Sequence, residues 1–578
     1  MEAAAAKAPT TPAPSDCPWL LLQLHPGISV FEGLQQAMLL CHRWKRFSRC
    51  PCFHAMEKKH QYCPSAKRFV MPRNQSKSRL LPTLYMATVN SAPRTRSIAF
   101  YTELRRLILD GVLNADDPLP SSRVLAQEAG IGRTAVESVL HRLSVEGLVQ
   151  RVQGSGTKVS ALLGHPILQA TQLFAQTAAV HVTPSDRGQA LGKITACREP
   201  EVFIAFNAAV ADVSRFPWTV WRDSTSQALR KYKHDILQTC DPAGLPKLRE
   251  LIAQHLNAYR GTRAKAHQVV VFGSSQTALS ALAQLLLNPG DAAAVEDPGY
   301  AGAVVAFKAA GARVVAVPVD TDGIRCESLP SSSAVPRVIY CTPSHQYPSG
   351  ATLSLQRRIA LLELAVQNKS CIIEDDYDGE FRYDSQPVPA IQGLIPDAPV
   401  AYLGTFSKVL FPGLRLAYAV VPTNLVEPLA NIRSQLDMCP PTMLQATMCQ
   451  FMESGELEAH IRRMLPRYSD KRDLMVRGIE GFHLGLMATV AQAGLHMTVR
   501  LPKQTGAACP EKLAAAVRAE AIKAKLALAF TADFSACGGI SDTLFLRYGG
   551  LSDEQISQGL STLNHVLRAA LKTHAPGS

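Results

Sequence analysis

Short apolar runs alternate with helix-length segments along most of the chain after residue 200. The runs have the length of buried strands, and the segments between them repeat apolar residues at the spacing of an amphipathic helix. The predicted strands are residues 269–272, 292–296, 314–317, 338–341, 371–374, 400–403 and 417–421. Strands that alternate with helices favour a mainly parallel sheet that is covered by helices on both faces.

The pattern changes after residue 422. Long helices come first, and a smaller α+β region follows, with strands near residues 494–501 and 543–548. We therefore predict that residues 201–573 form one α/β domain with a large and a small subdomain.

A separate block precedes this domain, over residues 98–160. Its predicted elements are a helix with Phe100, Leu104, Leu107 and Ile108 on one face, helices over 124–129 and 133–146, and strands over 148–152 and 158–159. Ser121 is a natural N-cap for the second helix, and Gly130-Ile131-Gly132 forms a tight turn before the third. This order predicts a winged helix-turn-helix, with residues 153–157 at the tip of the wing.

The remaining segments lack sustained periodicity. Residues 161–200, which mix Thr, Ala, Gln and Pro, are predicted to be a linker. Residues 1–97 are predicted to be a disordered extension, or a segment upstream of a true start at Met86. A zinc module is the alternative, because this segment holds five cysteines and several histidines, but it lacks a paired Cys₄ or Cys₂His₂ spacing.

Composition narrows the class of protein. A chain of 578 residues with 47% apolar and 19% charged residues is too long for one core, and two or more globular domains are expected. Residues 1–97 hold 14 Lys/Arg against 4 Asp/Glu, so the net charge of +13 says little about the rest of the chain. Because no run of 18 apolar residues occurs and the 14 cysteines lack a secreted-domain spacing, we expect a cytoplasmic protein with reduced thiols and no membrane partner.

Candidate chemistry centres on Lys408, which follows the predicted strand over 400–403. An acidic run, Glu374-Asp375-Asp376, ends another predicted strand. Pyridoxal 5′-phosphate (PLP) needs a lysine for its aldehyde and a carboxylate that keeps its pyridine nitrogen protonated. Lys408 can supply the first group and Asp375 the second. An acidic strand end equally suits a Mg²⁺ ion.

The phosphate of PLP needs its own ligands. Ser275 and Gln276 follow a strand and open a helix, and such N-termini bind phosphate through free backbone N–H groups. Thr405 and Arg415 flank the lysine and can reach the same phosphate. Taken singly, these residues form an ordinary strand–helix turn and an ordinary surface arginine.

Two tyrosines can serve the ring of PLP. Tyr377 lies on the same side of an extended segment as Asp375 and can donate to the ring hydroxyl, while Tyr300 can stack on the ring. Each tyrosine alone is as well explained by core packing. The ordered set of groups along one α/β unit favours the cofactor site.

Five segments carry a family resemblance: residues 241–249, 296–300, 342–350, 374–383 and 404–408. Together they resemble the signature set of the MocR/GabR-type regulators, GntR-superfamily transcription factors in which a winged helix is fused to a fold-type I aminotransferase-like domain. The resemblance covers residues 98–573. It implies PLP as the cofactor, Lys408 as the Schiff-base lysine and a head-to-tail homodimer.

The resemblance also implies roles for single residues. Asp375 is then the partner of the pyridine nitrogen, Tyr377 the contact of the ring oxygen, Arg415 a phosphate ligand and Tyr300 the stacking ring. Residues 546–550 resemble the strand on which aminotransferases carry the arginine for the substrate carboxylate, so Arg547 is the candidate effector ligand. An ordinary strand arginine is the alternative. If Arg547 faces the site, the effector carries a carboxylate and an amine.

Several positions depart from the family pattern. Ser274 and Ala417 stand where the family has glycine, and Ala209 and Ala211 replace glycine and proline before Asp212. Thr239-Cys240 replaces a Tyr-Gly pair. The last two segments lie near the substrate side in the family, so they bear on the effector and on transaminase activity more than on the cofactor.

The winged block offers candidate DNA contacts. Arg133 and Thr134 begin the third helix, where a recognition helix enters the major groove, and Arg133 can bond guanine bidentately. Arg123 can reach a phosphate, and Gly154 and Gly156 let the wing backbone approach the DNA. The block holds seven Lys/Arg and seven Asp/Glu, so it is not a general basic patch, and a protein-interaction module is the alternative. The resemblance to GntR-type domains favours double-stranded operator DNA.

The leading prediction is a PLP-dependent transcriptional regulator. A small amine or amino-acid effector would displace Lys408 and form an external aldimine with the cofactor. The alternative is a functional PLP-dependent aminotransferase with an accessory DNA-binding domain.

Overall fold

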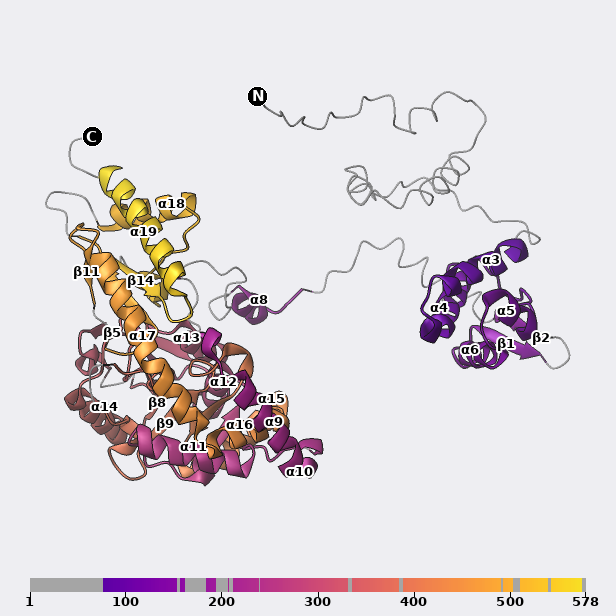
Figure 1. Ribbon diagram of the computed structural model, residues 1–578. Coiled ribbons are helices and arrows are strands. Elements are labelled where there is room, and N and C mark those ends of the chain that lie inside the picture. The colour runs from indigo at the N-terminus through magenta and orange to yellow at the C-terminus, as the bar shows by residue number, and fades with distance from the viewer. Residues whose placement is uncertain are drawn as a thin grey trace, which may run out of the picture. The chain divides into compact units, whose positions relative to one another are not determined.

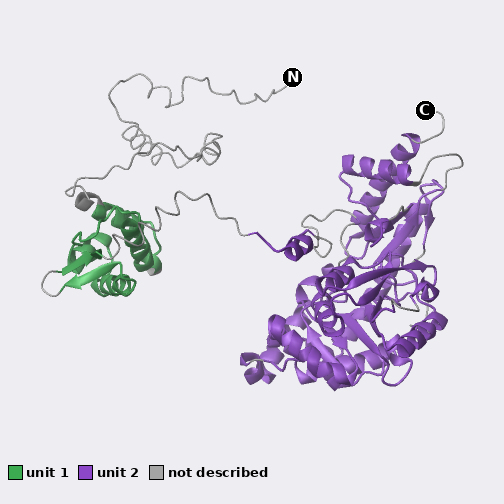
Figure 2. Cartoon of the chain, turned by 180° about the vertical axis from the view of Figure 1, so that it is seen from behind, with its two compact units in different colours: residues 1–181 green, residues 182–578 purple. Residues whose placement is uncertain are grey.

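The computed structural model describes residues 76–152, 156–161, 183–193, 206, 211–238, 240–330, 335–383, 388–489, 492–502, 510–538 and 542–573. The chain divides into two compact units, residues 1–181 and residues 182–578 (Figure 2). Each unit has its own hydrophobic core, and each is described by itself.

The first unit contains a winged helix-turn-helix, as predicted (Figure 1). Its elements are α3 (Ser76–Val89), α4 (Arg96–Leu109), α5 (Ser122–Ala129), α6 (Arg133–Val145), β1 (Val149–Val152) and β2 (Gly156–Val159). The backbone N–H of Val124 donates to the Ser121 hydroxyl at 3.4 Å, which confirms the predicted cap of α5. The two strands pair antiparallel and form the wing.

Helical structure in this unit is present before residue 98. Helix α3 packs against α4 and α5. Leu80 and Leu84 of α3 are 4% and 1% exposed and belong to the same core as Phe100 and Leu125. Residues 76–97 therefore differ from the predicted disordered extension. The short helix lacks a strong amphipathic period and contains Pro82, so only its tertiary contacts identify it. The cysteines of the proposed zinc module lie outside the described residues.

The second unit is built on an eight-stranded sheet in the order β3-β10-β9-β8-β7-β4-β5-β6. Its strands are β3 (Val269–Phe272), β4 (Ala292–Asp297), β5 (Arg313–Asp320), β6 (Gly323–Ile324), β7 (Val338–Cys341), β8 (Cys371–Asp376), β9 (Val400–Thr405) and β10 (Ala417–Val420). Strands β9, β8, β7, β4 and β5 run parallel, while β10 runs antiparallel to both of its neighbours. The sheet is thus mainly parallel, as predicted.

The described helices of the second unit belong either to the layers on the two faces of the large sheet or to the small subdomain. They are α8 (Asp186–Gly192), α9 (Trp218–Lys231), α10 (Lys233–Leu237), α11 (Pro246–Tyr259), α12 (Ser275–Leu286), α13 (Ala301–Ala309), α14 (Leu355–Asn368), α15 (Thr423–Asp437), α16 (Thr442–Glu453), α17 (Glu456–Glu480), α18 (Pro510–Lys523) and α19 (Asp553–Thr573). Alternate strand residues reach opposite layers: Val270 packs with α12 and α15, and Val271 packs with α11 and α16. Helix α8 falls within the predicted linker, most of which lies outside the described residues.

A smaller antiparallel sheet, in the order β11-β12-β14-β13, forms the small subdomain. Its strands are β11 (Met487–Ala488), β12 (His496–Arg500), β13 (Ala529–Phe530) and β14 (Thr543–Arg547). Met497 and Leu546 belong to the core beneath α18 and α19. The alternate residues His496 and Arg547, paired in register across the two strands, reach the other face of the sheet and line a cavity there. Helix α17 runs from the large subdomain into the small one (Figure 1).

The strand directions bring the candidate chemistry to one edge. Strand β3 points the same way as β9, because both are antiparallel to β10. The carboxyl ends of β3, β4, β7, β8 and β9 therefore share one edge of the sheet, which is where open α/β sheets bind ligands.

No described helix combines the length and apolar character needed to cross a lipid bilayer. The seven cysteines among the described residues are free thiols, as expected.

Candidate cofactor site and DNA-binding helix

A cavity of about 520 Å³ lies at the carboxyl edge of the large sheet and extends to the small subdomain. All nine residues that the sequence suggested for the cofactor and the effector line it: Ser275, Gln276, Tyr300, Asp375, Tyr377, Thr405, Lys408, Arg415 and Arg547. Residues spread over more than 270 positions of the chain thus meet in one place. The structure brings these side chains together, while the individual roles remain predictions.

Asp375 lies at the end of β8 and is 5% exposed. The Tyr340 hydroxyl donates to its Oδ2 at 2.8 Å, whereas Oδ1 has no hydrogen-bond partner among the described residues. Burial raises the pKa of Asp375 to about 7, against the opposing effects of the Tyr340 hydrogen bond and the Lys408 charge. A buried carboxylate oxygen without a donor suits a cationic N–H group such as a protonated pyridine nitrogen.

The N-terminus of α12 provides the candidate phosphate site. Ser274, which replaces the family glycine, caps this helix: its hydroxyl accepts from the Thr277 backbone N–H at 3.1 Å. Residues 274–277 line the cavity together with Thr405, the last residue of β9. Backbone N–H groups in the first turn of a helix and nearby hydroxyls together favour an anion.

Arg415 reaches the same cavity from an unusual backbone conformation. It follows a short 3₁₀ helix (Pro412–Leu414) and has φ +51°, in the left-handed region, which costs a non-glycine residue about 1–2 kcal/mol. Strained residues gather at functional sites. The conformation returns the chain directly from the loop after Lys408 into β10, so Arg415 stands at the start of that strand.

Tyr300 lines the cavity next to two other tyrosines, with ring-centroid distances of 6.5 Å to Tyr340 and 6.0 Å to Tyr347. Its hydroxyl donates to Gln276 Oε1 at 3.3 Å, and the Gln276 amide donates to the Gly302 carbonyl at 2.9 Å. These bonds hold the ring of Tyr300 beside the first turn of α12. Gln276 therefore positions Tyr300 in addition to lining the candidate phosphate site.

Arg547 enters the cavity from β14 and donates to the Tyr347 hydroxyl at 2.7 Å. The guanidinium also lies 4.9 Å from the ring centroid of Phe545 and 6.0 Å from that of Phe534. The sequence left an ordinary strand arginine open as an alternative, and the structure instead directs Arg547 into the cavity. A charged arginine with aromatic neighbours can bind a carboxylate.

Sequence reasoning missed several cavity residues, among them Tyr340, Tyr347, Asp378 and His496. Tyr347 and Asp378 lie within segments that carry the family resemblance, so their position was available but their role was not. Tyr340 and His496 occupy strands, where period-2 alternation cannot tell a cavity face from a core face.

Asp212, which the family pattern retains, and Cys240, which departs from it, both lie away from the cavity. Asp212 accepts hydrogen bonds from Lys471 and Arg467 of α17, both at 2.6 Å, and does not line the cavity. Cys240 contacts Gln445 and also lies outside the lining residues. Within this subunit these positions support the scaffold, and Ala209 and Thr239 lie outside the described residues.

Comparison with known proteins agrees with this architecture. Residues 98–159 match the family model of bacterial regulatory proteins of the gntR family, and residues 206–528 match that of aminotransferase class I and II. The probable rhizopine catabolism regulatory protein MocR of Rhizobium meliloti is 34% identical over 407 residues, which span 70% of this chain and 81% of that protein. The chain belongs to the MocR/GabR family of transcriptional regulators.

Other relatives of this MocR-type chain support both halves of the fusion. The pyridoxine biosynthesis transcriptional regulator PdxR of Corynebacterium glutamicum is 31% identical and aligns over 64% of this chain and 76% of its own length. Among solved structures, kynurenine aminotransferase of Pyrococcus horikoshii has a TM-score of 0.58 at 27% identity, with 70% of this chain and 99% of that chain covered. A multiple substrate aminotransferase of Thermococcus profundus has a TM-score of 0.59 at 25% identity, with the same coverage.

The second unit of this MocR-type regulator is a PLP-binding domain of the aminotransferase fold. The residues present fit the cofactor. Lys408 would supply the amine, Asp375 has a buried oxygen without a hydrogen-bond partner among the described residues, and the α12 N-terminus with Arg415 would form the anion site. Magnesium, the other reading of the acidic strand end, is disfavoured: Asp376 is bound by Arg260 at 2.7 Å, and Glu374 accepts two backbone N–H bonds.

The first unit is the DNA-binding domain of the regulator. Arg133 and Thr134 are exposed at the start of α6, and Arg123 is exposed on α5. Arg151 of the wing strand donates to Glu137 of α6 at 2.8 Å, so the wing and the recognition helix are held together. Gly156 opens β2 with φ +85°, a conformation that favours glycine, and Gly154 lies outside the described residues.

Proposed function

We propose that this regulator senses a small amine that carries a carboxylate and converts its binding into a change in operator recognition. The observation that carries the proposal is the presence of Arg547 and Lys408 in one cavity. Lys408 marks where an amine reacts, and Arg547 supplies a cation for a carboxylate. An amino acid combines both groups in one small molecule.

Each of the cavity residues has its own proposed role toward the cofactor. Lys408 would hold PLP through its amine, at the place where an effector amine would compete with it, and PLP would supply the aldehyde that reacts with either amine. Asp375 would pair with the pyridine N–H, and Tyr300 would stack on the ring. Tyr377 donates to the ring oxygen. The phosphate ligands are Ser275, Gln276, Thr405 and Arg415.

The coupling to DNA follows from the two subdomains. The Arg547–Tyr347 hydrogen bond joins the small subdomain to the large one. An effector carboxylate competes with the Tyr347 hydroxyl for the guanidinium, so the bound and free states differ in the contacts between subdomains. Such a differential interaction is what a ligand needs to shift a conformational equilibrium.

The DNA-bound form is proposed to be a head-to-tail homodimer whose two winged helices read two half-sites. Arg133 and Thr134 contact bases, Arg123 contacts phosphate, and the wing with Gly154 and Gly156 contacts the backbone of the operator. Trp218 and Leu237 are 67% and 86% exposed, and α9 and α10, which carry them, both contact α16. Such apolar surface supports an interface with a second copy.

In the proposed organisation, residues 98–160 bind DNA and residues 201–573 bind PLP and the effector. Residues 161–200 are the linker between these two domains. The regulator acts in the cytoplasm, where both operator DNA and free amino acids occur.

A spectral titration tests the proposal. Full-length protein with PLP should show the visible band of the lysine-linked cofactor, and one of a panel of amino acids should shift that band and change the affinity for DNA. Lys408→Ala should lose the band and the response to the amino acid. If no amine shifts the band, or if amino donors are turned over at ordinary enzyme rates without any DNA binding, the sensor proposal fails and the aminotransferase alternative gains.

A further inference from the structure

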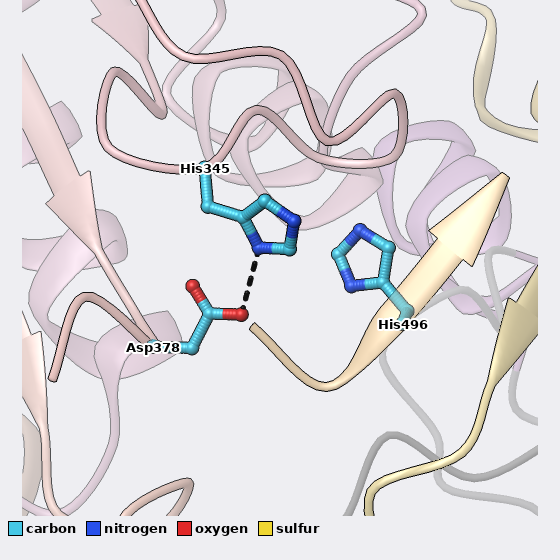
Figure 3. A group of neighbouring side chains, drawn as sticks. All are labelled: His345, Asp378 and His496. Atoms are coloured by element: carbon cyan, nitrogen blue, oxygen red, sulfur yellow. Dashed lines mark hydrogen bonds and ion pairs between the residues drawn. The ribbon is translucent and has the colours of Figure 1, made fainter. Parts of the chain in front are cut away.

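Three buried polar side chains form a cluster at the cavity: His345, Asp378 and His496 (Figure 3). Each is about 2% exposed. His345 Nδ1 lies 2.9 Å from Asp378 Oδ2, and the His496 ring stacks on the His345 ring with a centroid distance of 4.4 Å. Asp378 and His496 line the cavity, and His345 lies against both of them.

The cluster is poorly suited to a metal ion. Ligand nitrogens bind an ion along lone pairs in the ring plane, and the two imidazole planes are only 25° apart in a stacked arrangement. Burial lowers the pKa of His496 well below its usual value. The positive charges of Arg547 and Lys408 lower it further, because they oppose protonation of the ring. The same charges would repel a divalent cation.

The hydrogen-bond roles in the cluster are determined by Asp378. A carboxylate only accepts, so His345 Nδ1 must carry the hydrogen that lies between them. The Tyr377 hydroxyl oxygen lies 3.2 Å from the same Nδ1. Because this nitrogen already donates, it cannot accept the Tyr377 hydrogen. The hydroxyl hydrogen of Tyr377, which lines the cavity, therefore points to another acceptor.

Packing holds the His345 ring in place. Gly494 has φ +82°, and a Cβ there would lie 2.1 Å from His345 Cε1 and 2.4 Å from Asp378 Oδ2. On another side, a Cβ at Gly350 would lie 3.3 Å from His345 Nε2. Only glycine lets the two loops approach the imidazole this closely, so the ring has little room to turn away from Asp378.

We propose that Asp378 and His345 are positioning residues that keep the Tyr377 hydroxyl directed as a donor at the ring oxygen of PLP. The inference rests on the proposed role of Tyr377. A donor stabilises the anionic form of that oxygen, so it lowers the pH at which the lysine-linked cofactor loses its proton. Burial raises the pKa of Tyr377 well above its usual value, which keeps the hydroxyl protonated as a donor.

The substitution Asp378→Asn should reverse the hydrogen-bond direction. With its NH₂ group toward His345, the amide donates to Nδ1, and the imidazole hydrogen moves to Nε2. The single lone pair of Nδ1 is then shared between the amide and the Tyr377 hydroxyl, so Nδ1 competes with the cofactor for the Tyr377 hydrogen. Each amide orientation leaves one buried donor unsatisfied, either the NH₂ group or the Nε2–H, because neither Asp378 Oδ1 nor His345 Nε2 has a partner among the described residues. In both orientations a neutral amide holds the hydrogen on Nδ1 less strongly than the carboxylate does, so the Tyr377 hydroxyl loses its fixed direction.

The test is a pH titration of the visible band of full-length protein with PLP. We expect Asp378→Asn and His345→Leu to raise the midpoint by about one pH unit. His345→Asn, whose amide nitrogen occupies the place of Nδ1, should titrate like the wild type. Tyr548→Phe is the matched control, because it removes a neighbouring buried hydrogen bond to the Gly494 carbonyl (3.3 Å) without touching Tyr377.

A double variant separates positioning from general damage. Tyr377→Phe should raise the midpoint as much as Asp378→Asn, and adding Asp378→Asn to it should cause no further shift. The other charged and titratable groups around the site are unchanged in this comparison: Glu296, Tyr347, Asp375, Lys408, His496 and Arg547.

Two results would overturn the inference: wild-type midpoints in both Asp378→Asn and His345→Leu, or an Asp378→Asn shift that persists without the Tyr377 hydroxyl. The proposed sensing function can fail independently of this inference. If the band shows these pH shifts but no amine changes it, the positioning role of Asp378 and His345 stands and the sensing function does not.

Discussion

The guanidinium of Arg547 donates a hydrogen bond of 2.7 Å to the hydroxyl of Tyr347. Arg547 belongs to a strand of the small subdomain, and Tyr347 belongs to the loop after β7 of the large subdomain. The pair closes one side of the cofactor cavity. A carboxylate that accepted from the Arg547 guanidinium in place of the Tyr347 hydroxyl would form a charge-assisted and therefore stronger hydrogen bond.

Replacing Arg547 should separate recognition of the effector from binding of the cofactor. We expect Arg547→Met to weaken the amino acid that shifts the wild-type band most by about 10- to 100-fold, because a charge-assisted hydrogen bond is lost. The PLP band should persist. Spectral titration of both proteins measures the change, and Arg500→Met, an exposed arginine of the neighbouring strand β12, is the control. Equal affinities would show that Arg547 does not bind the effector.

Substitutions of two arginines in the DNA-binding domain should affect DNA binding in different ways. Arg133→Ala is expected to cost about 1–3 kcal/mol at one base position, whereas Arg123→Ala should weaken all sequences alike and reduce the salt dependence by about one ion. Selection from a random duplex library with each protein, followed by salt titration of the selected DNA, distinguishes the two. A uniform loss for Arg133→Ala would remove it from base recognition.

Helix α3 should contribute to the stability of the first unit. Leu84 is 1% exposed in the shared core, so Leu84→Ala is expected to cost about 2–5 kcal/mol and to lower the thermal transition of this unit. Met86 on the same helix is 56% exposed, and Met86→Ala should change the transition little. A chain that starts at Met86 lacks Leu80 and Leu84 and should lose as much stability as the leucine variant. Unchanged melting of that shorter chain would contradict the role of α3.

Asp212 should make the stability of the second unit dependent on pH. Burial alone would raise its pKa, but hydrogen bonds from Lys471, Ser214 and Arg467 outweigh burial and hold the pKa well below its usual value. Asp212→Asn leaves the buried Lys471 without a charged partner and is expected to cost about 3 kcal/mol at neutral pH.

The sign of the pH effect follows from the direction of that shift. A carboxyl group whose pKa is lower in the folded than in the unfolded chain stabilises the fold above its unfolded pKa of about 3.9 and loses this contribution as the pH falls further. The difference in urea-unfolding free energy between wild type and Asp212→Asn should therefore be full above about pH 5 and shrink below about pH 4. A difference that stays constant with pH would exclude the charge as its cause.

Many helices and strands of this protein could be predicted from the sequence. Strand β3 over Val269–Phe272 and helix α6 from Arg133 appear where periodicity and the turn at residues 130–132 predicted them, because apolar runs and turn residues act over a few positions. The linked motifs around Lys408 also predicted the cavity residues, since parallel strands bring their carboxyl ends to one edge.

The same reasoning failed where the deciding neighbours are far apart in the chain. Helix α3 has little pattern of its own, and its place in the core comes from α4 and α5. His496 could have faced either side of β12, and only its stacking on His345, 151 positions earlier, assigns it to the cavity.

The sequence by itself determined the two folds, the winged helix and the aminotransferase-like domain, and it predicted that Lys408 and Asp375 lie in one cavity. Each of these depends on local propensity or on motifs within one strand–helix unit. Only the tertiary structure decided that Arg547 reaches Tyr347, that Asp212 serves α17, and that His345 donates to Asp378 beside Tyr377. Those relationships depend on which strand edges and loops meet in space. A hydrogen bond between distant segments leaves no periodic trace in the chain.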